Sequence, residues 1–439
     1  MKKILLWSVI PPFNDCTAKE ILTRNLIGSN TGNLLFHHSV VRALMTDADT
    51  EFETQFSSVA RNLDEAAARA NETCSCFAIP LANAFRKDYI PKLEVLTQFI
   101  QRLKIPCVVI GVGVQTAAAD KLKEGLPFDG QVRDFVRAVL DRSSLIGVRG
   151  EYTADYLKRL GFSEERHFSQ IGCPSMYMFG GDLPETRALR LDAEASVCVN
   201  GKIDSGAEIH GFMARSCQEF PNYWYIPQRI EEIWMMYAGM PIPRRHRWNI
   251  PEYLPTDFGN RVLRERRSAA FLNVSAWLDF MRDKDLSYGC NIHGNIAATL
   301  AGVPAVVVAR DLRVAELANF FQIPMISLEE IRSGIGIREA CERADFSGIA
   351  ANHPKRFARF VDFLDQNGLE HIYRNGGSVQ NAPYDLRLQQ IAQAPAIYPR
   401  TPLSPAQRVD CLPVYWAAVK HYRVRYIRKR NARRGSGRR

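Results

Sequence analysis

Short apolar runs alternate with stretches of helical periodicity along most of this chain, and this alternation is the feature that most constrains its fold. Buried strands are expected in the first half at residues 4–10, 76–80, 106–110 and 145–148. Helices are expected between them at residues 34–45, 89–103, 131–140 and 154–160, where apolar residues recur three and four positions apart. Strands that alternate with helices indicate a parallel sheet covered by helices on both faces.

The same alternation resumes after a polar break at residues 180–191. Strands are expected at 196–199, 286–288 and 305–308, with helices at 274–282 and up to residue 300. The sequence therefore predicts an α/β fold of two Rossmann-like, doubly wound domains, with ligands at the carboxyl ends of strands that face the cleft between them. The expected divisions are an N-terminal domain at 1–185, a C-terminal domain at 186–350, closing helices at 351–400 and a basic tail at 401–439.

The net charge of +10 is confined to the end of the chain. Residues 411–439 contain ten Lys or Arg and no acidic residue, which leaves 47 basic and 47 acidic side chains in residues 1–410. A neutral body offers no extended basic groove, so we do not expect nucleic acid as a partner.

The tail also has an aromatic pattern. Tyr415, Val419, Tyr422 and Tyr426 would form one stripe of a helix surrounded by basic residues. Such a helix can lie on an anionic bilayer surface, and a solvated, disordered end is the alternative. No apolar run reaches the roughly 20 residues of a membrane span, and the N-terminal apolar run is too short for a signal peptide. We expect a cytoplasmic protein, with its ten cysteines mostly reduced and buried, that contacts the inner membrane face peripherally.

An aromatic insert at residues 221–252 interrupts the second half of the chain. It contains Tyr223, Trp224, Tyr225, Trp234, Tyr237 and Trp248, with Arg244, Arg245 and Arg247. These side chains could pack in the core, or they could form a loop that stacks on sugars and binds anions.

The segment that most suggests chemistry follows the expected strand at 286–288. Gly289 predicts a sharp turn, and His293 falls in the first turn of the next helix. The N-terminus of a helix favours a bound anion, Gly294 would let a ligand approach the backbone, and a histidine there can exchange protons near neutral pH. A capping or packing histidine is the alternative.

Two arginines follow other expected strands. Arg149 comes directly after residues 145–148, and Arg313 comes soon after residues 305–308. At the carboxyl end of a strand, an arginine points toward the cleft and can clamp an anion with its guanidinium group. For Arg149, a structural ion pair with Glu151 or Asp155 is the alternative.

In order and spacing, several motifs resemble those of the polysaccharide pyruvyl transferase family, over roughly residues 25–335. They are Gly32-Asn33, Pro80-Leu-Ala-Asn83-Ala-Phe-Arg86, Gly111-Val-Gly-Val-Gln115, Val148-Arg149-Gly-Glu-Tyr152-Thr-Ala, Ile171-Gly-Cys-Pro-Ser175, His293-Gly294-Asn295-Ile-Ala-Ala and Asp311-Leu-Arg313-x-x-Glu316-Leu. The resemblance implies an architecture like that of the GT-B glycosyltransferases. It also implies transfer of a pyruvyl group from phosphoenolpyruvate to sugar hydroxyls of an exopolysaccharide, a capsule or a lipid-linked precursor, with a cyclic ketal as product and no metal or redox cofactor.

The resemblance also suggests roles for individual residues. His293 would act as general acid or base, and Arg149, Arg313, Gly294 and Asn291 would bind the donor. Supporting positions would be Asn33, Asn83, Gln115, Tyr152, Asn295 and Glu316.

One position departs from the family, whose usual element is Arg-x-His-Gly, because Asn291 stands where the arginine is expected. Arg310 or Arg313 could compensate, the donor could differ, or the protein could be a weak or inactive relative. Two other functions stay open. The two-domain scaffold would also accommodate a nucleotide-sugar glycosyltransferase of GT-B type, and Asn291 makes a non-catalytic glycan-binding protein tenable.

Overall fold

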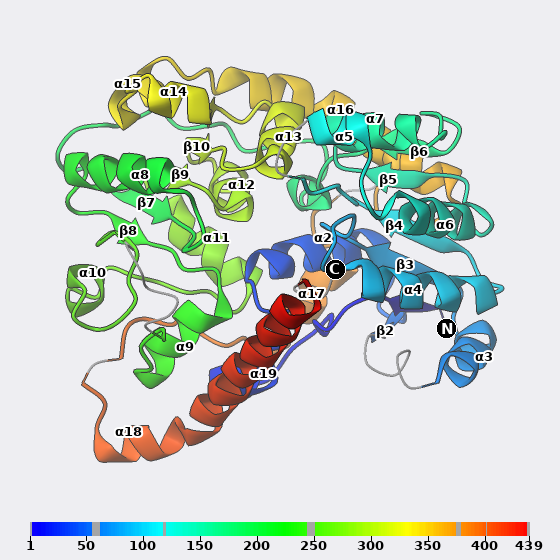
Figure 1. Cartoon of the computed structure of the whole chain (residues 1–439), viewed down its shortest axis with the longest axis horizontal. Helices are drawn as coiled ribbons and strands as arrows, with labels where there is room; N and C mark the ends of the chain where they lie inside the picture. The colour runs from blue at the N-terminus through cyan, green and yellow to red at the C-terminus, as the bar shows by residue number, and fades with distance from the viewer. Residues whose placement is uncertain are drawn as a thin grey trace.

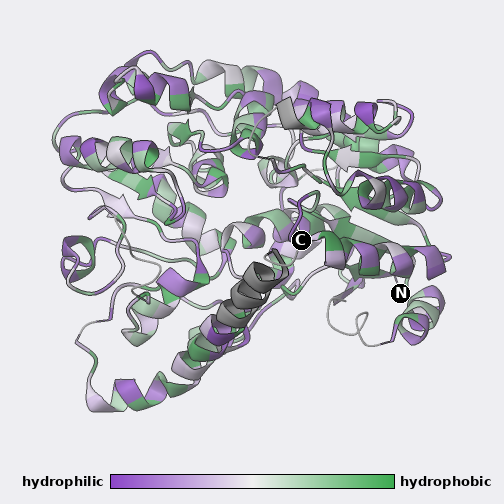
Figure 2. Cartoon of the chain, in the orientation of Figure 1, coloured by the Kyte–Doolittle hydropathy of each residue, from purple (hydrophilic) through white to green (hydrophobic). Residues whose placement is uncertain are grey.

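The structure, a computed structural model, describes residues 2–54, 62–116, 120–243, 251–374, 379–400 and 402–436. Two parallel sheets flanked by helices form the body of the molecule (Figure 1). The predicted α/β class with Rossmann-like sheets is therefore confirmed. Hydrophobic residues are concentrated in the strands, and hydrophilic residues cover the outer helices (Figure 2). The predicted domain divisions at 185/186, 350/351 and 400/401 stay proposals.

The first sheet has the order β2-β1-β3-β4. Its strands are β1 (Lys3–Leu6), β2 (Glu51–Thr54), β3 (Cys76–Pro80) and β4 (Cys107–Ile110), all parallel. A parallel pair, β5 (Ile146–Val148) and β6 (Phe168–Gln170), adjoins β4, because the Gly111 and Val112 amides both donate to the Gly147 carbonyl at 3.0 Å. The first strand is shorter than predicted. It ends at Leu6, and a turn follows in which the Ser8 hydroxyl accepts a hydrogen bond from the Ile10 amide.

Helices cover both faces of the first sheet. They are α1 (Ala18–Arg24), α2 (Gly32–Leu44), α3 (Leu63–Thr73), α4 (Ile90–Arg102), α5 (Asp120–Glu124), α6 (Asp129–Leu140) and α7 (Glu151–Arg159). Successive strand residues point to opposite faces, as the period of a strand requires. Phe77 and Ile79 pack with α3, α4 and α6, whereas Ala78 between them packs with α2.

The second sheet has five parallel strands in the order β11-β10-β9-β7-β8. They are β7 (Val197–Asn200), β8 (Trp224–Tyr225), β9 (Leu286–Gly289), β10 (Ala305–Val308) and β11 (Met325–Ile326). The helices of this half are α8 (Ala207–Glu219), α9 (Ile230–Ala238), α10 (Arg261–Arg264), α11 (Val274–Arg282), α12 (Ile292–Leu300), α13 (Leu312–Phe321), α14 (Leu328–Arg332) and α15 (Ile337–Glu342).

The chain returns to the first half after α15. Helix α16 (Ser347–Gln366) lies against it, with the ring of Phe360 stacked 4.8 Å from that of Tyr177. Just beyond this helix, Asn367 accepts hydrogen bonds from the amides of Ser144 and Leu145 at 3.1 Å. Helix α17 (Pro383–Gln389) supplies Asp385, which pairs with the buried Arg42 of α2. These contacts hold the segments after α15 on the first half.

The tail forms α18 (Pro405–Asp410) and α19 (Leu412–Ser436), and α19 packs against α1 and α9 (Figure 1). Cys411, Val414 and Ala418 face inward and are buried, so this part of the tail is folded. The predicted stripe is partly wrong, because Tyr415 and Val419 are exposed whereas Tyr422 packs against Trp234. Tyr426 lies outside the described side chains. No helix in the described segments is long and apolar enough to cross a bilayer.

The aromatic insert is mainly core. Tyr223, Tyr225, Trp234 and Tyr237 are buried, and the half-buried Trp224 packs its ring against Phe280. The packing alternative is therefore right for these residues. Trp248 and the three arginines at 244, 245 and 247 lie outside the described residues. All ten cysteines are free, and all but Cys16 are buried.

Candidate active site between the two sheets

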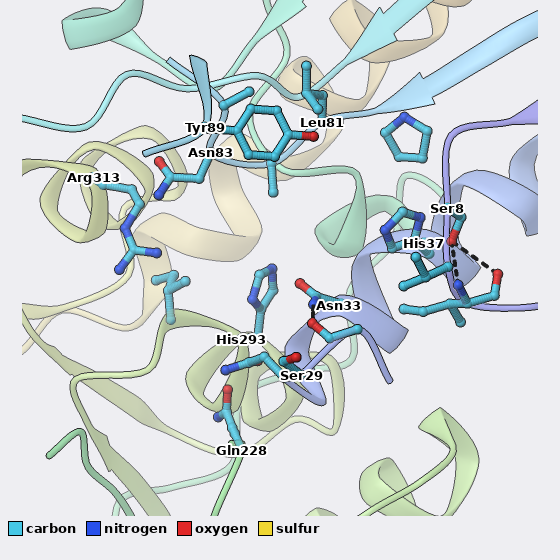
Figure 3. Close-up of a pocket in the computed structure, with 18 of the residues that line it drawn as sticks. Ser8, Ser29, Asn33, His37, Leu81, Asn83, Tyr89, Gln228, His293 and Arg313 are labelled. Atoms are coloured by element: carbon cyan, nitrogen blue, oxygen red, sulfur yellow. Dashed lines mark hydrogen bonds between the residues drawn. The ribbon is translucent and has the colours of Figure 1, made fainter. Parts of the chain in front are cut away.

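A cavity of about 550 Å³ lies where the carboxyl ends of strands from both sheets meet. Segments that follow β1, β3 and β5 line one side, and segments that follow β7, β9 and β10 line the other. In Figure 3 the ring of His293 projects into this space, with Arg313 on one side, His37 on the other, and Asn83 and Tyr89 across from it. This is where parallel α/β folds place their ligands.

Arg149 lines the cavity directly after β5 and is 2% exposed. Its Nε donates to the Gly111 carbonyl at 3.1 Å, and its guanidinium lies 6.0 Å from the centre of the Phe36 ring. No carboxylate of the described residues forms an ion pair with it; Asp155 instead pairs with Lys158 at 3.6 Å. The alternative of a structural pair with Glu151 or Asp155 is therefore wrong. Burial, together with the positive charge of Arg313, lowers the pKa of Arg149 to about 10.

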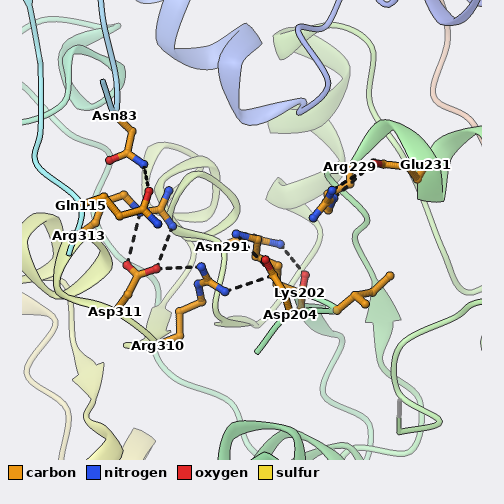
Figure 4. Close-up of polar contacts among 12 residues, drawn as sticks. Asn83, Gln115, Lys202, Asp204, Arg229, Glu231, Asn291, Arg310, Asp311 and Arg313 are labelled. Atoms are coloured by element: carbon orange, nitrogen blue, oxygen red, sulfur yellow. Dashed lines mark hydrogen bonds and ion pairs between the residues drawn. The ribbon is translucent and has the colours of Figure 1, made fainter. Parts of the chain in front are cut away.

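Two more cations line the opposite side. Arg313, in the first turn of α13, lies 3.4 Å from Asp311, the residue that caps this helix. Lys202 lies two residues beyond β7, with its Nζ 3.6 Å from Asp204. Figure 4 shows Asp311 between Arg310 and Arg313, and Lys202 beside Asn291. With Arg149, these side chains give the cavity an excess of positive charge, which suits an anionic ligand.

His293 lies in the first turn of α12 and lines the cavity. Its Nε2 is 3.7 Å from Sγ of Cys173, and its ring meets that of Phe36 edge-on. Burial, and then the nearby Arg149 and Arg313, lower the pKa of His293 to about 3. The ring is therefore neutral at physiological pH.

Asn291 and Gly294 lie on either side of His293 and are occupied by contacts within the protein. The Asn291 side chain donates from Nδ2 to the Gly201 carbonyl at 2.8 Å, although Asn291 also lines the cavity. A β-carbon on Gly294 would lie 2.6 Å from Nε2 of Gln228 and 3.0 Å from Nδ2 of Asn200. Gly294 therefore allows close packing against these residues, and the ligand approach that we expected there stays a prediction.

Among the supporting residues, Asn33 and Asn83 line the cavity. Asn33 donates to the Gly28 carbonyl at 2.9 Å. Asn83 donates to Oε1 of Gln115 at 2.6 Å, so Gln115 stands behind Asn83 and does not line the cavity itself.

Three supporting residues do not line this cavity, and their supporting role stays a prediction. Asn295 is fully buried, and its amide ties α12 to β9 by donating to the Gly289 carbonyl at 3.0 Å. Tyr152 and Glu316 line a separate cavity. Glu316 accepts hydrogen bonds from the amide and the hydroxyl of Thr153, at 2.6 and 3.2 Å, and so joins α13 to α7. Burial raises the pKa of Glu316 to about 7.

The sequence analysis did not identify four cavity residues, Lys202, His37, Tyr89 and Gln228. Nδ1 of His37, Nε2 of Gln228 and Oδ1 of Asn83 are buried without a hydrogen-bond partner among the residues that the structure describes. Buried polar atoms are normally paired, so this group of atoms indicates a polar ligand. Only Lys202 had a local signal, as a cation two residues after a buried strand; His37 and Gln228 reach the cavity through tertiary packing.

Solved structures were compared with the whole chain. The Staphylococcus aureus MnaA–UDP complex has 11% identity and a TM-score of 0.39, covering 90% of this chain and 100% of that one. Anabaena HepE in complex with UDP has 12% identity and a TM-score of 0.38, covering 84% of this chain and 98% of that one. MurG of Acinetobacter baumannii has 10% identity and a TM-score of 0.36, covering 83% and 100%. The assignment of fold class rests on the two parallel sheets described above.

Sequence comparison identifies the family. No curated protein sequence matches the chain significantly. The family model for polysaccharide pyruvyl transferase matches residues 83–311, just over half of the chain. The matched segment runs from Asn83 to Asp311 and contains Arg149, Lys202 and His293. The chain therefore belongs to the polysaccharide pyruvyl transferase family and is a transferase.

Proposed function

We propose that this protein transfers the pyruvyl group of phosphoenolpyruvate to two hydroxyls of a sugar, in an exopolysaccharide, a capsule or a lipid-linked precursor. The observation that carries the proposal is that Arg149, Arg313 and His293 line one cavity. Phosphoenolpyruvate carries a carboxylate and a phosphate on three carbons. Two arginines contributed by opposite halves of the protein suit a ligand with two anionic ends.

The chemistry balances as an addition followed by a substitution. A proton adds to C3 of phosphoenolpyruvate, and a sugar hydroxyl oxygen bonds to C2 and loses its proton. The bond between C2 and the phosphate oxygen then breaks, phosphate leaves, and a second hydroxyl oxygen bonds to C2 with loss of its proton. The products are a cyclic ketal and inorganic phosphate. Of the two protons that the hydroxyls lose, one balances the proton added to C3 and the other ends on the departing phosphate.

His293 is the proposed acid–base group for these transfers. Its ring is neutral, because burial and the two arginines lower its pKa to about 3. A neutral imidazole can accept the hydroxyl proton. A bound donor would compensate the positive charge of Arg149 and Arg313 and so raise the pKa of His293, which favours imidazolium formation only when the donor is present.

The acceptor sugar is proposed to bind on the side of the cavity formed by the first half. Ser8, Asn33 and Asn83 offer hydroxyl and amide groups there, and Tyr89 offers a ring. Amides and hydroxyls pair with sugar hydroxyls, and a flat ring covers the apolar face of a pyranose.

The C-terminal helix is proposed to hold the protein at the cytoplasmic face of an anionic membrane, where a lipid-linked acceptor would be found. Leu412, Tyr415, Trp416 and Val419 are exposed together on α19, at spacings that place them on one face. The ten basic residues after residue 410 supply charge complementary to anionic lipid headgroups.

Incubation with phosphoenolpyruvate and candidate sugars tests the reaction directly. Release of phosphate together with a ketal on the sugar supports the proposal, and His293→Ala should abolish both while the thermal unfolding midpoint stays unchanged. Turnover only with a nucleotide sugar would instead identify a glycosyltransferase. Glycan binding without any turnover would identify a non-catalytic relative.

A further inference from the structure

We propose that Lys202 supplies the donor site with the positive charge that the family's arginine would bring at position 291, and that Asn291 positions the loop that carries Lys202. This inference rests on the proposed function, because it concerns how the same cavity holds phosphoenolpyruvate. It assigns binding to a lysine in the loop after β7 and a positioning role to Asn291.

Hydrogen bonds join the loop that carries Lys202 to the start of α12. Oδ1 of Asn200 accepts from the Asn291 amide at 2.7 Å, and the Asn200 carbonyl accepts from the Cys290 amide at 3.1 Å. The Asn291 side chain completes the connection through its bond to the Gly201 carbonyl. Gly201 directly precedes Lys202, so Asn291 fixes the backbone from which the lysine extends.

Lys202 lies in the same cavity as His293, Arg149 and Arg313. Its side chain is 23% exposed, and Asp204 is the carboxylate that pairs with it among the described residues. Asp204 is itself shared, because Nη1 of Arg310 lies 3.3 Å from the same oxygen. The lysine is therefore incompletely neutralised within the protein and can pair with an anion in the cavity.

The charges around Lys202 favour an anionic ligand. It is faced by Asp204 from its own loop, by Arg310 and Arg313 from the segment after β10, and by Arg229 from the segment before α9. Burial, and then Arg310, lower the pKa of Lys202 to about 8. Crowding of like charges around a buried ammonium is relieved when an anion binds.

Arg310, one of the two arginines that could compensate for Asn291, is engaged elsewhere. Its Nη2 lies 2.9 Å from Asp311 and its Nη1 contacts Asp204, so both ends of the guanidinium pair with carboxylates. It lines a neighbouring cavity with Asp204 and Ser205 rather than the one that contains His293. Arg313 lines the main cavity, but it extends from the start of α13. Lys202 follows Gly201, whose carbonyl binds the Asn291 side chain, and is therefore the cation beside Asn291.

Calorimetric titration of the full-length protein with phosphoenolpyruvate, and separately with inorganic phosphate, tests the inference. Lys202→Met should weaken binding of phosphoenolpyruvate about 10- to 100-fold, the effect of losing one charge-assisted contact. Lys202→Arg should bind within a few-fold of the unmodified protein. Lys355→Met, which removes a lysine outside this cavity, is the matched control and should leave binding unchanged.

The decisive variant combines Lys202→Met with Asn291→Arg. This double variant should bind phosphoenolpyruvate at least about tenfold more tightly than Lys202→Met, because the charge returns at the neighbouring position. Affinity of the unmodified protein should also fall as the pH rises above about 8, whereas that of Lys202→Met should not. A merely structural lysine would produce neither the recovery nor this difference in pH dependence.

The outcomes separate the two proposals. If the unmodified protein binds phosphoenolpyruvate and Lys202→Met binds it equally well, the role of Lys202 is overturned while the proposed function stands. If the double variant binds no better than Lys202→Met, the proposal that Lys202 replaces the charge of an arginine at position 291 is overturned. If the unmodified protein binds neither phosphoenolpyruvate nor phosphate, the proposed function fails, and the inference fails with it.

Discussion

Gly32, the first residue of α2, lies so close to His293 that a β-carbon there would sit 2.6 Å from Nδ1 of the imidazole. This contact joins the two halves at the centre of the cavity, because α2 belongs to the first half and α12 to the second. A side chain at position 32 would force the His293 ring to move. The glycine thus sets where the proposed acid–base group stands.

Gly32→Ala should therefore slow transfer strongly while the protein stays folded. A displacement of about 1 Å in a reacting group can reduce a rate about 100-fold, so we expect a loss of roughly that size in kcat. The matched control is Gly130→Ala on α6, where an added β-carbon meets no atom within 4 Å. Equal rates for the two variants, measured by phosphate release, would contradict the proposed position of His293.

Glu316 offers a test of how Arg149 is held in place. Its carboxylate accepts both hydrogen bonds from Thr153, four residues after Arg149. Glu316→Ala leaves these buried donors unpaired and should cost about 1–3 kcal/mol of unfolding free energy and raise KM for the donor. Glu316→Gln keeps an acceptor oxygen, so it should retain most of the unfolding free energy and a KM for the donor close to that of the unmodified protein. Denaturant unfolding and donor titration measure the two effects, and an Ala variant as stable as the Gln variant would refute this role.

The sequence predicted the fold well because buried parallel strands leave a local pattern. The expected strands at 76–80 and 305–308 have the same bounds as β3 and β10. The expected helix at 274–282 has the same bounds as α11. It also indicated Arg149, His293 and Arg313, which follow strands and so line the cleft. Tyr152 was misplaced because it lies on α7 beyond the strand end and turns toward a different cavity. Gln228 could not be found locally, because tertiary packing brings it to the site, where its backbone carbonyl accepts from the Thr31 amide at 2.8 Å.

Stability should depend on pH through buried histidines. Burial lowers the pKa of His37 to about 3 and that of His38 to about 4, below the value of about 6.5 in an unfolded chain. The unfolded chain then binds more protons as the pH falls. The stability that each neutral, buried histidine contributes is therefore fully present above pH 6.5 and is lost as the pH falls toward 4. Between pH 6.5 and 5 the loss is about 1.6 kcal/mol for each such histidine.

His38→Gln should reduce this pH dependence, since it removes one titrating group from the protein. Denaturant unfolding at pH 6.5 and pH 5 gives the two free energies for each protein. The variant should lose less stability between these values than the unmodified protein. A variant with the same loss would show that His38 does not titrate as described.

The exposed face of α19 predicts binding to anionic membranes. Trp416 is 64% exposed and Tyr415 is 44% exposed, beside the basic end of the chain. Vesicles that contain phosphatidylglycerol should sediment the protein, and vesicles of phosphatidylcholine alone should do so much less. Tyr415→Ser with Trp416→Ser should weaken this binding without changing phosphate release from soluble sugar acceptors. Retention of full vesicle binding by that double variant would argue against this surface.

The central claim is that one cavity binds phosphoenolpyruvate between Arg149 and Arg313 and that His293 then moves the protons of transfer. The most direct measurement is calorimetric titration of phosphoenolpyruvate into the unmodified protein, Arg149→Met and His293→Ala, with phosphate release followed in parallel. We predict that the unmodified protein binds and turns over, that Arg149→Met loses about 10- to 100-fold in affinity, and that His293→Ala still binds but releases no phosphate. Undiminished phosphate release by His293→Ala, or equal affinity in Arg149→Met, would contradict it.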